Sequence, residues 1–231
     1  MTLFLFFDDS FFFNLGLFCI GFYLTVSIFF GVFCSNSQEL AFPNILPAFL
    51  FFSTFILVFI FFTISLDIAP PIQVSSFFLF NQLFLIIFLV ASILTLVITR
   101  SFISCYKISK FEYDLFFSFV ILGSICLCFA DDFLQIYLAI ELQSLCLYVF
   151  ATFNRNSEFS TESGLKYFVF GAIISCFLLL GFYFIYFSFG STSLEILFSL
   201  IKDSNDSVFF LGSTFVLLAL FFKVGAVPFH F

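Results

Sequence analysis

Two charged residues interrupt long apolar segments of this sequence, Glu141 and Lys223. Glu141 lies in FLQIYLAIELQSLCLYVFATF, residues 133–153, and Lys223 lies in VFFLGSTFVLLALFFKVGAVPFHF, residues 208–231. An ionised side chain in hydrocarbon costs roughly 2.5 to 3.5 kcal/mol on insertion scales, so it is retained where a partner or a proton-transfer role supports it. The two residues therefore predict a proton or ion pathway, and a structural buried ion pair is the alternative.

A carboxylate and a lysine at membrane depth control each other's proton affinity. Burial disfavours the charged form of a lysine, and a nearby carboxylate favours it. At an effective dielectric constant of about 20, unit charges some 4 Å apart interact by about 4 kcal/mol, roughly a thousandfold in proton affinity. A change in the influence of Glu141 would therefore switch Lys223 between holding and releasing a proton.

Two further titratable residues are candidates for the same pathway. Lys166 begins a predicted span and is placed to pass protons toward Glu141, although a lysine at a helix end more often extends to the membrane surface. His230 titrates near neutrality and follows a predicted helix break, with capping or packing as the alternative. The seven cysteines show no CxxC and no Cys/His spacing of a zinc or iron-sulfur site, so no metal or cofactor site is expected.

The composition is that of a membrane protein. Hydrophobic residues make up 63% of the chain and charged residues 9%, against about 45 to 50% and about 25% in soluble domains. The net charge of −7, with seven Lys and Arg in total, excludes a nucleic-acid-binding protein. Phe supplies 49 of 231 residues, a bias that we attribute to T-rich codons of an organelle genome. The N-terminus, MTLFLFFDDS, lacks the character of a transit peptide, which favours synthesis inside the mitochondrion.

The elements that position these residues are predicted to be membrane-spanning helices, because a span needs about 20 apolar residues. The fold class is therefore an all-α polytopic membrane protein. Residues 1–110 are predicted to hold three leading helices and a basic loop, and residues 111–231 hold helices four to seven. The seven predicted spans are residues 11–34, 47–66, 77–99, 114–129, 133–153, 164–189 and 207–227.

The positive charges predict the orientation of these spans. Arg100, Lys107 and Lys110 fall between spans three and four, and Arg155 and Lys166 flank the loop between spans five and six. By the positive-inside rule these loops face inward and the N-terminus faces outward. In a mitochondrial protein, outward is the intermembrane space.

Polar and small residues gather on single faces of three spans. In span five, Tyr137, Glu141, Ser144 and Tyr148 follow helical spacing, so this stripe is expected to point into the bundle. Small residues are expected to pack helix against helix in lipid. They are Gly171 and Ser175 in span six, and Gly212, Ala219 and Ala226 beside Lys223 in span seven.

The heights of Glu141 and Lys223 present a difficulty. Glu141 lies eight residues into its span, roughly 12 Å, and Lys223 about 15 residues in, roughly 22 Å, from the same side. Contact then requires tilt, the helix break after Lys223, or a late start of span seven. Gly225 and Pro228 predict that break. The chain stops soon after it, so a second polypeptide or a missing portion is expected to supply further helices.

Three segments resemble NADH dehydrogenase subunit 2, an antiporter-like membrane subunit of respiratory complex I. They are ADDFLQIYLAIELQSLCLYVFATF, STESGLKYFVFGAIISCFLLLGFYFIY and FFKVGAVPFHF, which occur in the family's order over roughly the last hundred residues. The combination of a mid-helix Glu, an LKYF-G-S-FLL-G-Y pattern and FK-VPFH is specific. The first 110 residues share only hydropathy with the family.

The resemblance implies a fold of two inverted five-helix repeats, each with a broken helix, after three leading helices; this chain would hold those three and most of the first repeat. It implies that Glu141 and Lys223 are the coupled pair of a proton path. NADH, FMN, iron-sulfur clusters and quinone would be bound by other subunits of the complex, with no redox chemistry on this chain. The second repeat is absent and Phe231 departs from the family's pattern, which puts transport by this chain alone in doubt.

Three functions remain open from the sequence. The first is a proton-translocating, non-redox subunit of NADH:ubiquinone oxidoreductase in the mitochondrial inner membrane. The second is a unit of a multi-subunit cation/proton antiporter, which association with flavin and iron-sulfur subunits would exclude. The third is a membrane scaffold in which Glu141 and Lys223 only stabilise packing.

Overall fold

The computed structural model describes residues 111–154, 157–201 and 206–227, and isolated helical residues nearer the N-terminus. The chain divides into two compact units, Met1–Leu122 and Gly123–Phe231, and only the second carries the candidate residues. Predicted span 47–66, the basic loop, Pro228 and His230 lie outside the described residues, and the predicted division at residue 110 stays a prediction. The isolated residues are 21, 24–26, 28–29, 83–84, 87–88, 90–92, 94–95 and 98–99.

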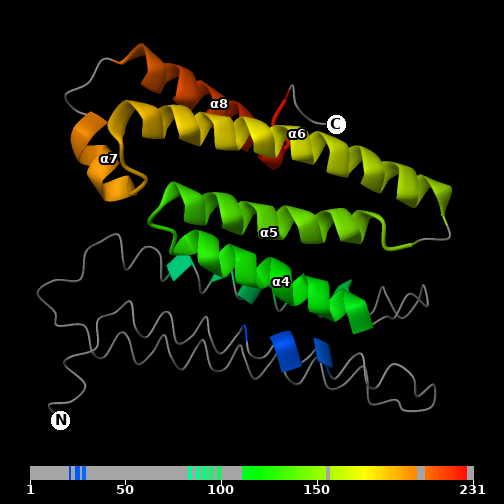
Figure 1. Cartoon of the computed structure of the whole chain (residues 1–231). Coiled ribbons are helices and arrows are strands. Elements are labelled where there is room, and N and C mark those ends of the chain that lie inside the picture. Colours follow the sequence, from blue (N-terminus) through cyan, green and yellow to red (C-terminus); the bar gives the residue numbers. More distant parts are fainter. Residues whose placement is uncertain are drawn as a thin grey trace, which may run out of the picture. The chain divides into compact units, whose positions relative to one another are not determined.

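Five helices make up the described C-terminal part of the chain (Figure 1). Three of them, α5, α6 and α8, are long and apolar enough to cross a membrane, and α4 carries a shorter apolar stretch. Because the described residues form helices and no named strand, the all-α prediction is confirmed. The helices are α4 (Phe111–Cys128), α5 (Phe133–Ala151), α6 (Glu158–Phe189), α7 (Leu194–Ile201) and α8 (Ser207–Val224).

The four predicted spans from residue 114 onward correspond to α4, α5, α6 and α8. The largest difference lies at the start of α6, which begins at Glu158 rather than at residue 164 and runs for 32 residues. At 1.5 Å per residue, α6 is about 48 Å long, well beyond a hydrocarbon core of about 30 Å. Its polar first turns therefore extend past the apolar part of a bilayer.

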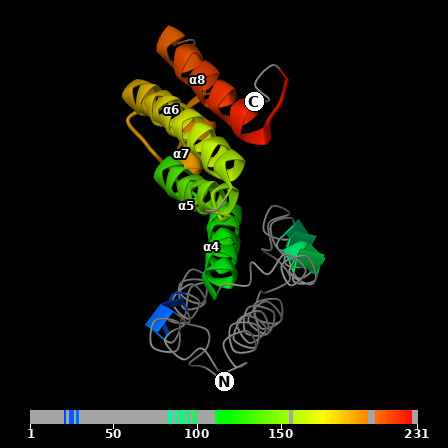
Figure 2. The same cartoon turned by 90° about the vertical axis from the view of Figure 1, so that its right-hand side faces the viewer.

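Helices α5 and α6 run antiparallel, joined by a short connection. Phe133 at the start of α5 stacks on Phe182, with ring centroids 4.6 Å apart. Tyr148 near the end of α5 meets Tyr167 edge-on, with centroids 4.7 Å apart. Both views show α5 and α6 side by side along their length (Figures 1 and 2).

Helix α8 packs antiparallel on α6. Phe209 contacts Phe189 edge-on at 5.3 Å, and Phe215 stacks on Phe177 at 5.9 Å. Between these pairs the two backbones come close, since a Cβ added at Gly181 would lie 2.9 Å from the carbonyl oxygen of Gly212. Small residues at a helix crossing allow this approach, as expected for Gly212, whereas its partner glycine on α6 was not predicted.

The short helix α7 was not predicted from the sequence. Eight residues cannot span a membrane, and α7 instead follows a segment tied to the beginning of α5. The Leu194 amide donates to the Asp131 carbonyl at 2.9 Å, and the Phe133 amide donates to the Thr192 carbonyl at 3.1 Å. Leu197 is buried while Phe198 is exposed, so one face of α7 packs inward.

The core where α5, α6 and α8 meet is apolar. Its buried members are Ile140 of α5, Leu178 and Phe182 of α6, and Ala219 of α8. This core lies on the α7 side of Glu141, since its α5 members precede Glu141 in the helix. The partly buried residues that pack against it are Phe133, Ile136, Tyr137, Ile174 and Val216.

Candidate functional site

Glu141 and Lys223 lie at the same level of the bundle, despite their different depths in sequence. Phe209 of α8 lies beside Phe189 of α6. Lys223 follows Phe209 by fourteen residues, and fourteen residues back from Phe189 is residue 175, so Lys223 lies level with residue 175 of α6. Phe133 of α5 lies beside Phe182 of α6. Glu141 follows Phe133 by eight residues, so by the same count it lies level with residue 174 of α6. Both helices are antiparallel to α6 and rise equally per residue, so the two side chains face the middle of α6.

The expected difference in height disappears because α8 begins farther out than α5. Helix α6 extends seven residues past the level of Phe133, from Phe182 to Phe189, and α8 starts beside that extension. Seven residues correspond to about 10 Å, which matches the gap estimated from the sequence. The offset depends on α7, which brings the chain back to the start of α5 before α8 begins.

Lys223 occupies the last turn of α8, where a glycine ends the helix. The Gly225 amide donates to the Phe222 carbonyl at 3.0 Å, and the Ala226 amide donates to the Phe221 carbonyl at 2.9 Å. Gly225 has a φ of 71°, the left-handed conformation that glycine adopts most readily at such an end. The predicted break after Lys223 is thus confirmed as far as Val227, and Ala226 lies beyond the helix rather than on its packing face.

The end of α8 favours a cation at this position. The last carbonyls of a helix carry a partial negative charge, which stabilises a lysine in the final turn. The pairs of Phe215 with Phe177 and of Phe209 with Phe189 place this end beside the middle of α6, as Figure 1 shows. Lys223 therefore sits at a negatively polarised helix end inside the bundle.

The ammonium of Lys223 is buried and interacts with Glu141 through space. Its Nζ atom finds no hydrogen-bond partner in the part of the chain that the structure describes. The Glu141 carboxylate interacts with it electrostatically. Because no hydrogen bond fixes the two groups together, the charge on one can change without breaking a direct bond to the other.

The polar stripe of α5 points into the bundle, as predicted. Ser144 and Tyr148 are buried, and Tyr137 and Glu141 are half-buried. The Ser144 hydroxyl lies 3.0 Å from the Glu141 backbone carbonyl and 3.0 Å from carboxylate oxygen Oε2, and donates toward both. The Tyr148 side chain in turn interacts with Ser144 and with Glu141.

Gly171 of α6 makes room for Tyr148. A Cβ added at Gly171 would overlap the Tyr148 hydroxyl and the end of its ring. Two turns toward the α5–α6 connection, Gly164 makes room for Thr152 in the same way. The sequence identified Gly171 as a packing residue but did not indicate that its partner is a tyrosine hydroxyl. Gly164 was not singled out in the sequence, although its seven-residue spacing from Gly171 could have indicated a shared face.

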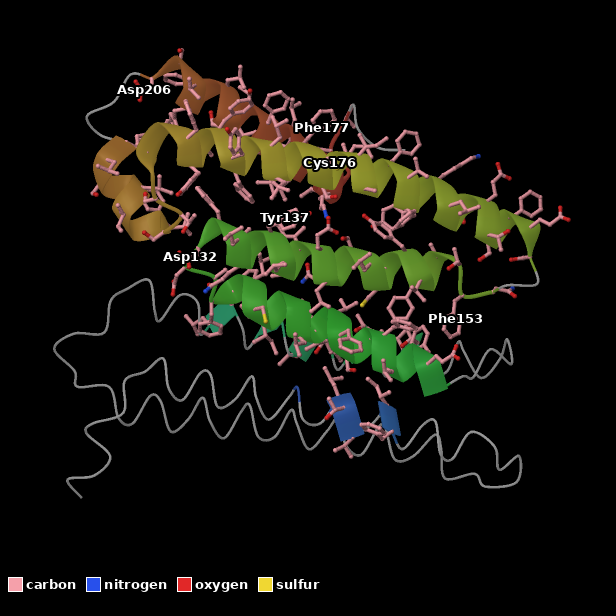
Figure 3. The ribbon with its side chains drawn as sticks, viewed as in Figure 1. Asp132, Tyr137, Phe153, Cys176, Phe177 and Asp206 are labelled. Carbon is pink, nitrogen blue, oxygen red and sulfur yellow. The ribbon has the colours of Figure 1, made fainter. Side chains whose placement is uncertain are left out.

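Tyr137 lies on the opposite side of Glu141 from Ser144. Figure 3 shows it between α5 and α6, with Phe177 on the far side of α6. Tyr137 interacts with Ser175, whose hydroxyl donates to the Ala172 carbonyl of its own helix at 2.9 Å. The Tyr137 side chain also packs against the apolar core.

The two remaining candidates are not at this centre. Lys166 forms an exposed ion pair with Glu162 one turn earlier in α6, with Nζ and Oε1 2.6 Å apart. This is the arrangement of a lysine that extends to the membrane surface, and a proton-relay role for Lys166 stays a prediction. His230 lies outside the described residues. Within the described ranges, no three His, Cys, Asp or Glu gather as a metal site would require.

Comparison with known proteins finds a match to one family of membrane proteins. Residues 130–231 match the family model described as NADH:quinone oxidoreductase/Mrp antiporter, transmembrane. These residues contain α5 to α8 and therefore the whole site. The match covers 102 of the 231 residues, and it agrees with the resemblance found in the sequence.

Individual relatives are subunits of one kind of complex. NADH-quinone oxidoreductase subunit N of Paramagnetospirillum magneticum is 42% identical over 148 residues, 62% of this chain and 30% of the relative. NADH-ubiquinone oxidoreductase chain 2 of Marchantia polymorpha is 37% identical over 164 residues, 68% of this chain and 33% of the relative. The chain thus spans about a third of the length of the curated relatives it matches, and a second polypeptide that supplies further helices stays a prediction.

The fold also has a solved counterpart. A chain in the structure of respiratory complex I from Thermus thermophilus with bound aureothin aligns with a TM-score of 0.70 at 22% identity. The alignment covers 93% of this chain and 45% of that chain. The likeness shows that the two chains share a fold over the aligned length.

Proposed function

We propose that this chain is a proton-translocating, non-redox subunit of NADH:ubiquinone oxidoreductase. The observation that carries the proposal is the placement of Glu141 and the buried Lys223 ammonium at one level of the bundle, coupled through space. The match of residues 130–231 to the family model and the similarity of the chain to subunit N and chain 2 support it. Redox energy from other subunits would be used here to move protons.

The proposed cycle uses the electrostatic coupling of the two residues. When Glu141 is ionised, its charge helps Lys223 to hold a proton. When Glu141 is protonated or its charge is offset, the buried ammonium loses that support and releases its proton. At an effective dielectric constant of about 20, charges some 4 Å apart couple by about 4 kcal/mol, and the coupling declines with distance. The size of the coupling is therefore sensitive to small movements of α8.

The proposed partners and location follow from the relatives. Other complex I membrane subunits would flank this chain in the bilayer, and chains that carry FMN, iron-sulfur clusters and quinone would supply the energy. The relative from Marchantia and the phenylalanine-rich composition support a mitochondrial inner membrane. The N-terminus would then face the intermembrane space.

Replacement of Lys223 tests the proposal. In the native complex reconstituted in sealed vesicles, Lys223→Ala is expected to lower NADH-driven proton pumping by on the order of 10²-fold, as for loss of a positioned proton-transfer group. NADH oxidation by an artificial acceptor should stay within twofold, because that reaction needs no proton transfer in the membrane. Leu220→Ala is the control, since Leu220 is partly exposed in the same helix. Unchanged pumping by Lys223→Ala would overturn the role of the lysine.

A cation/proton exchanger unit is the second candidate, because the matching family description also includes Mrp antiporters. Native gel separation after gentle solubilisation distinguishes the two. Migration in a large NADH-oxidising assembly with flavin and iron-sulfur subunits supports the complex I proposal. Migration in a small assembly without NADH-oxidising activity supports the exchanger.

A further inference from the structure

We propose that Tyr148 and Ser144 form a hydroxyl relay that carries protons to Glu141 from the side of the α5–α6 connection. The inference rests on the proposed function and adds the route and direction by which Glu141 is supplied. Its starting point is the hydrogen bond from the Ser144 hydroxyl to the Glu141 carboxylate, 3.0 Å long. A hydroxyl both donates and accepts, so it can pass on a proton, unlike an aliphatic side chain.

Tyr148 extends the relay by one helical turn. It lies four residues after Ser144 on the same face of α5, and its side chain interacts with that of Ser144. The proposed order of donation is Tyr148 to Ser144 to Glu141, which is possible because each hydroxyl can both donate and accept. Tyr148 is 7% exposed, so its ring is fixed by packing.

The surroundings of Tyr148 hold its hydroxyl at the entrance to the relay. Gly171 leaves space for the hydroxyl on one side. Tyr167, which is 42% exposed, contacts the ring edge-on and brings a second hydroxyl group near the surface. Tyr148 is three residues from the end of α5, so the entrance lies toward the α5–α6 connection. The charge distribution of the sequence predicts that this connection faces the matrix.

On the other side of Glu141, the described residues are mainly apolar. The residues toward α7 form the apolar core, in which Leu178 and Ala219 are each 1% exposed. Tyr137 is the polar residue of α5 nearest to Glu141 on that side, and it interacts with Ser175. Among the described residues, the Glu141 carboxylate accepts a hydrogen bond from Ser144 and none from Tyr137. Protons would thus reach Glu141 from one side only.

One transfer is balanced in protons and charge. A hydronium ion from solvent gives a proton to the Tyr148 oxygen, Tyr148 passes its own hydroxyl proton to Ser144, and Ser144 passes its proton to Oε2 of Glu141. Each hydroxyl ends with one O–H bond, the carboxylate becomes a carboxylic acid, and the hydronium becomes water. Rotation of the two hydroxyls restores the starting order.

The test compares variants in the native complex. Tyr148→Phe keeps the ring and its packing but removes the hydroxyl. Ser144→Ala is the second variant, because it removes the next hydroxyl without changing the contact of Tyr148 with Gly171. Each should lower NADH-driven pumping at least about tenfold, since a positioned proton donor contributes roughly 10²–10⁴-fold and solvent replaces part of it. Each should also raise the solvent deuterium isotope effect, which a purely structural role would not.

Two matched variants define the outcomes. Tyr137→Phe removes a hydroxyl on the apolar side and should have a smaller effect, and Tyr183→Phe removes an exposed one and should have none. Pumping within twofold of the parent with an unchanged isotope effect in both Tyr148→Phe and Ser144→Ala would overturn the relay. An equal loss in Tyr137→Phe would overturn its direction. Lys223→Ala is measured in parallel. If the proposed function is wrong, Lys223→Ala pumps like the parent. If only the relay is wrong, Lys223→Ala still loses pumping.

Discussion

The two sides of Glu141 differ in what a proton could follow. Toward the α5–α6 connection, Ser144 and Tyr148 carry hydroxyls on consecutive turns of one helix face. Toward α7, the space between helices is filled by apolar side chains, among them Leu178 and Phe182. We call these the hydroxyl side and the apolar side. Under the proposed relay, a carboxylate placed between them would exchange protons with the surface on the hydroxyl side.

This asymmetry is what directional transport requires. A group open to both surfaces at once would conduct protons down their gradient, and one closed to both would never titrate. The buried ammonium of Lys223 lies at the level of Glu141, where the apolar side begins. Release of its proton would then be the step at which protons leave the hydroxyl side.

Opening the apolar side should have the largest effect. Leu178→Ser removes a side chain that is 1% exposed and puts a hydroxyl in its place. We expect a loss of stability of about 2 to 5 kcal/mol, as for large-to-small core substitutions, together with a passive proton leak. Proton permeability of vesicles that contain the complex without NADH measures the leak.

The matched control is Leu179→Ser, one residue farther along α6 on an exposed face. It should leave both permeability and assembly unchanged. A tight membrane with Leu178→Ser in assembled complex would contradict the sealing role of the apolar side.

Crowding the hydroxyl side should have an intermediate effect. Gly171→Ala places a methyl group where the Tyr148 hydroxyl lies, so Tyr148 must shift. Overpacking of this kind costs about 1 to 3 kcal/mol, and pumping should fall severalfold as the hydroxyl leaves Ser144. Thermal unfolding of the complex measures the loss of stability, and the pumping rate measures the loss of proton transport.

A double-mutant cycle with Tyr148→Phe sharpens this prediction. Because both changes disable the same hydroxyl, their effects on pumping should be far from additive. Additive losses would show that Gly171 acts through α6 packing alone.

The smallest effect is expected where the hydroxyl side meets the α5–α6 connection, near the start of α6. Lys166 is exposed and paired with Glu162, and exposed ion pairs contribute little to stability. Lys166→Ala should therefore lower pumping by about twofold or less, because solvent can supply protons in place of an exposed lysine. Lys166→Arg is the control, and a loss of tenfold or more in Lys166→Ala would make Lys166 a required relay.

Much of the site could be predicted from the sequence because helical spacing alone determines which side chains share a face. The stripe of α5 and the break after Lys223 follow from spacing and from Gly225. The level of Lys223 relative to Glu141 could not be predicted, because it depends on how far α6 extends beyond α5 and on α7. The fit of Tyr148 to Gly171 also could not be predicted, because it depends on how α5 is aligned along α6, and the spacing of residues within one helix does not determine that alignment.

The most direct test is whether Glu141 gains and loses a proton during turnover. Infrared difference spectra of the native complex, recorded between the resting and NADH-reduced states, report carboxyl groups that change protonation. The proposed function predicts a carboxylic acid band that is absent in Glu141→Gln and shifted in Ser144→Ala, whose hydroxyl donates to that carboxylate. An unchanged difference spectrum in assembled Glu141→Gln would contradict a proton-carrying role for Glu141.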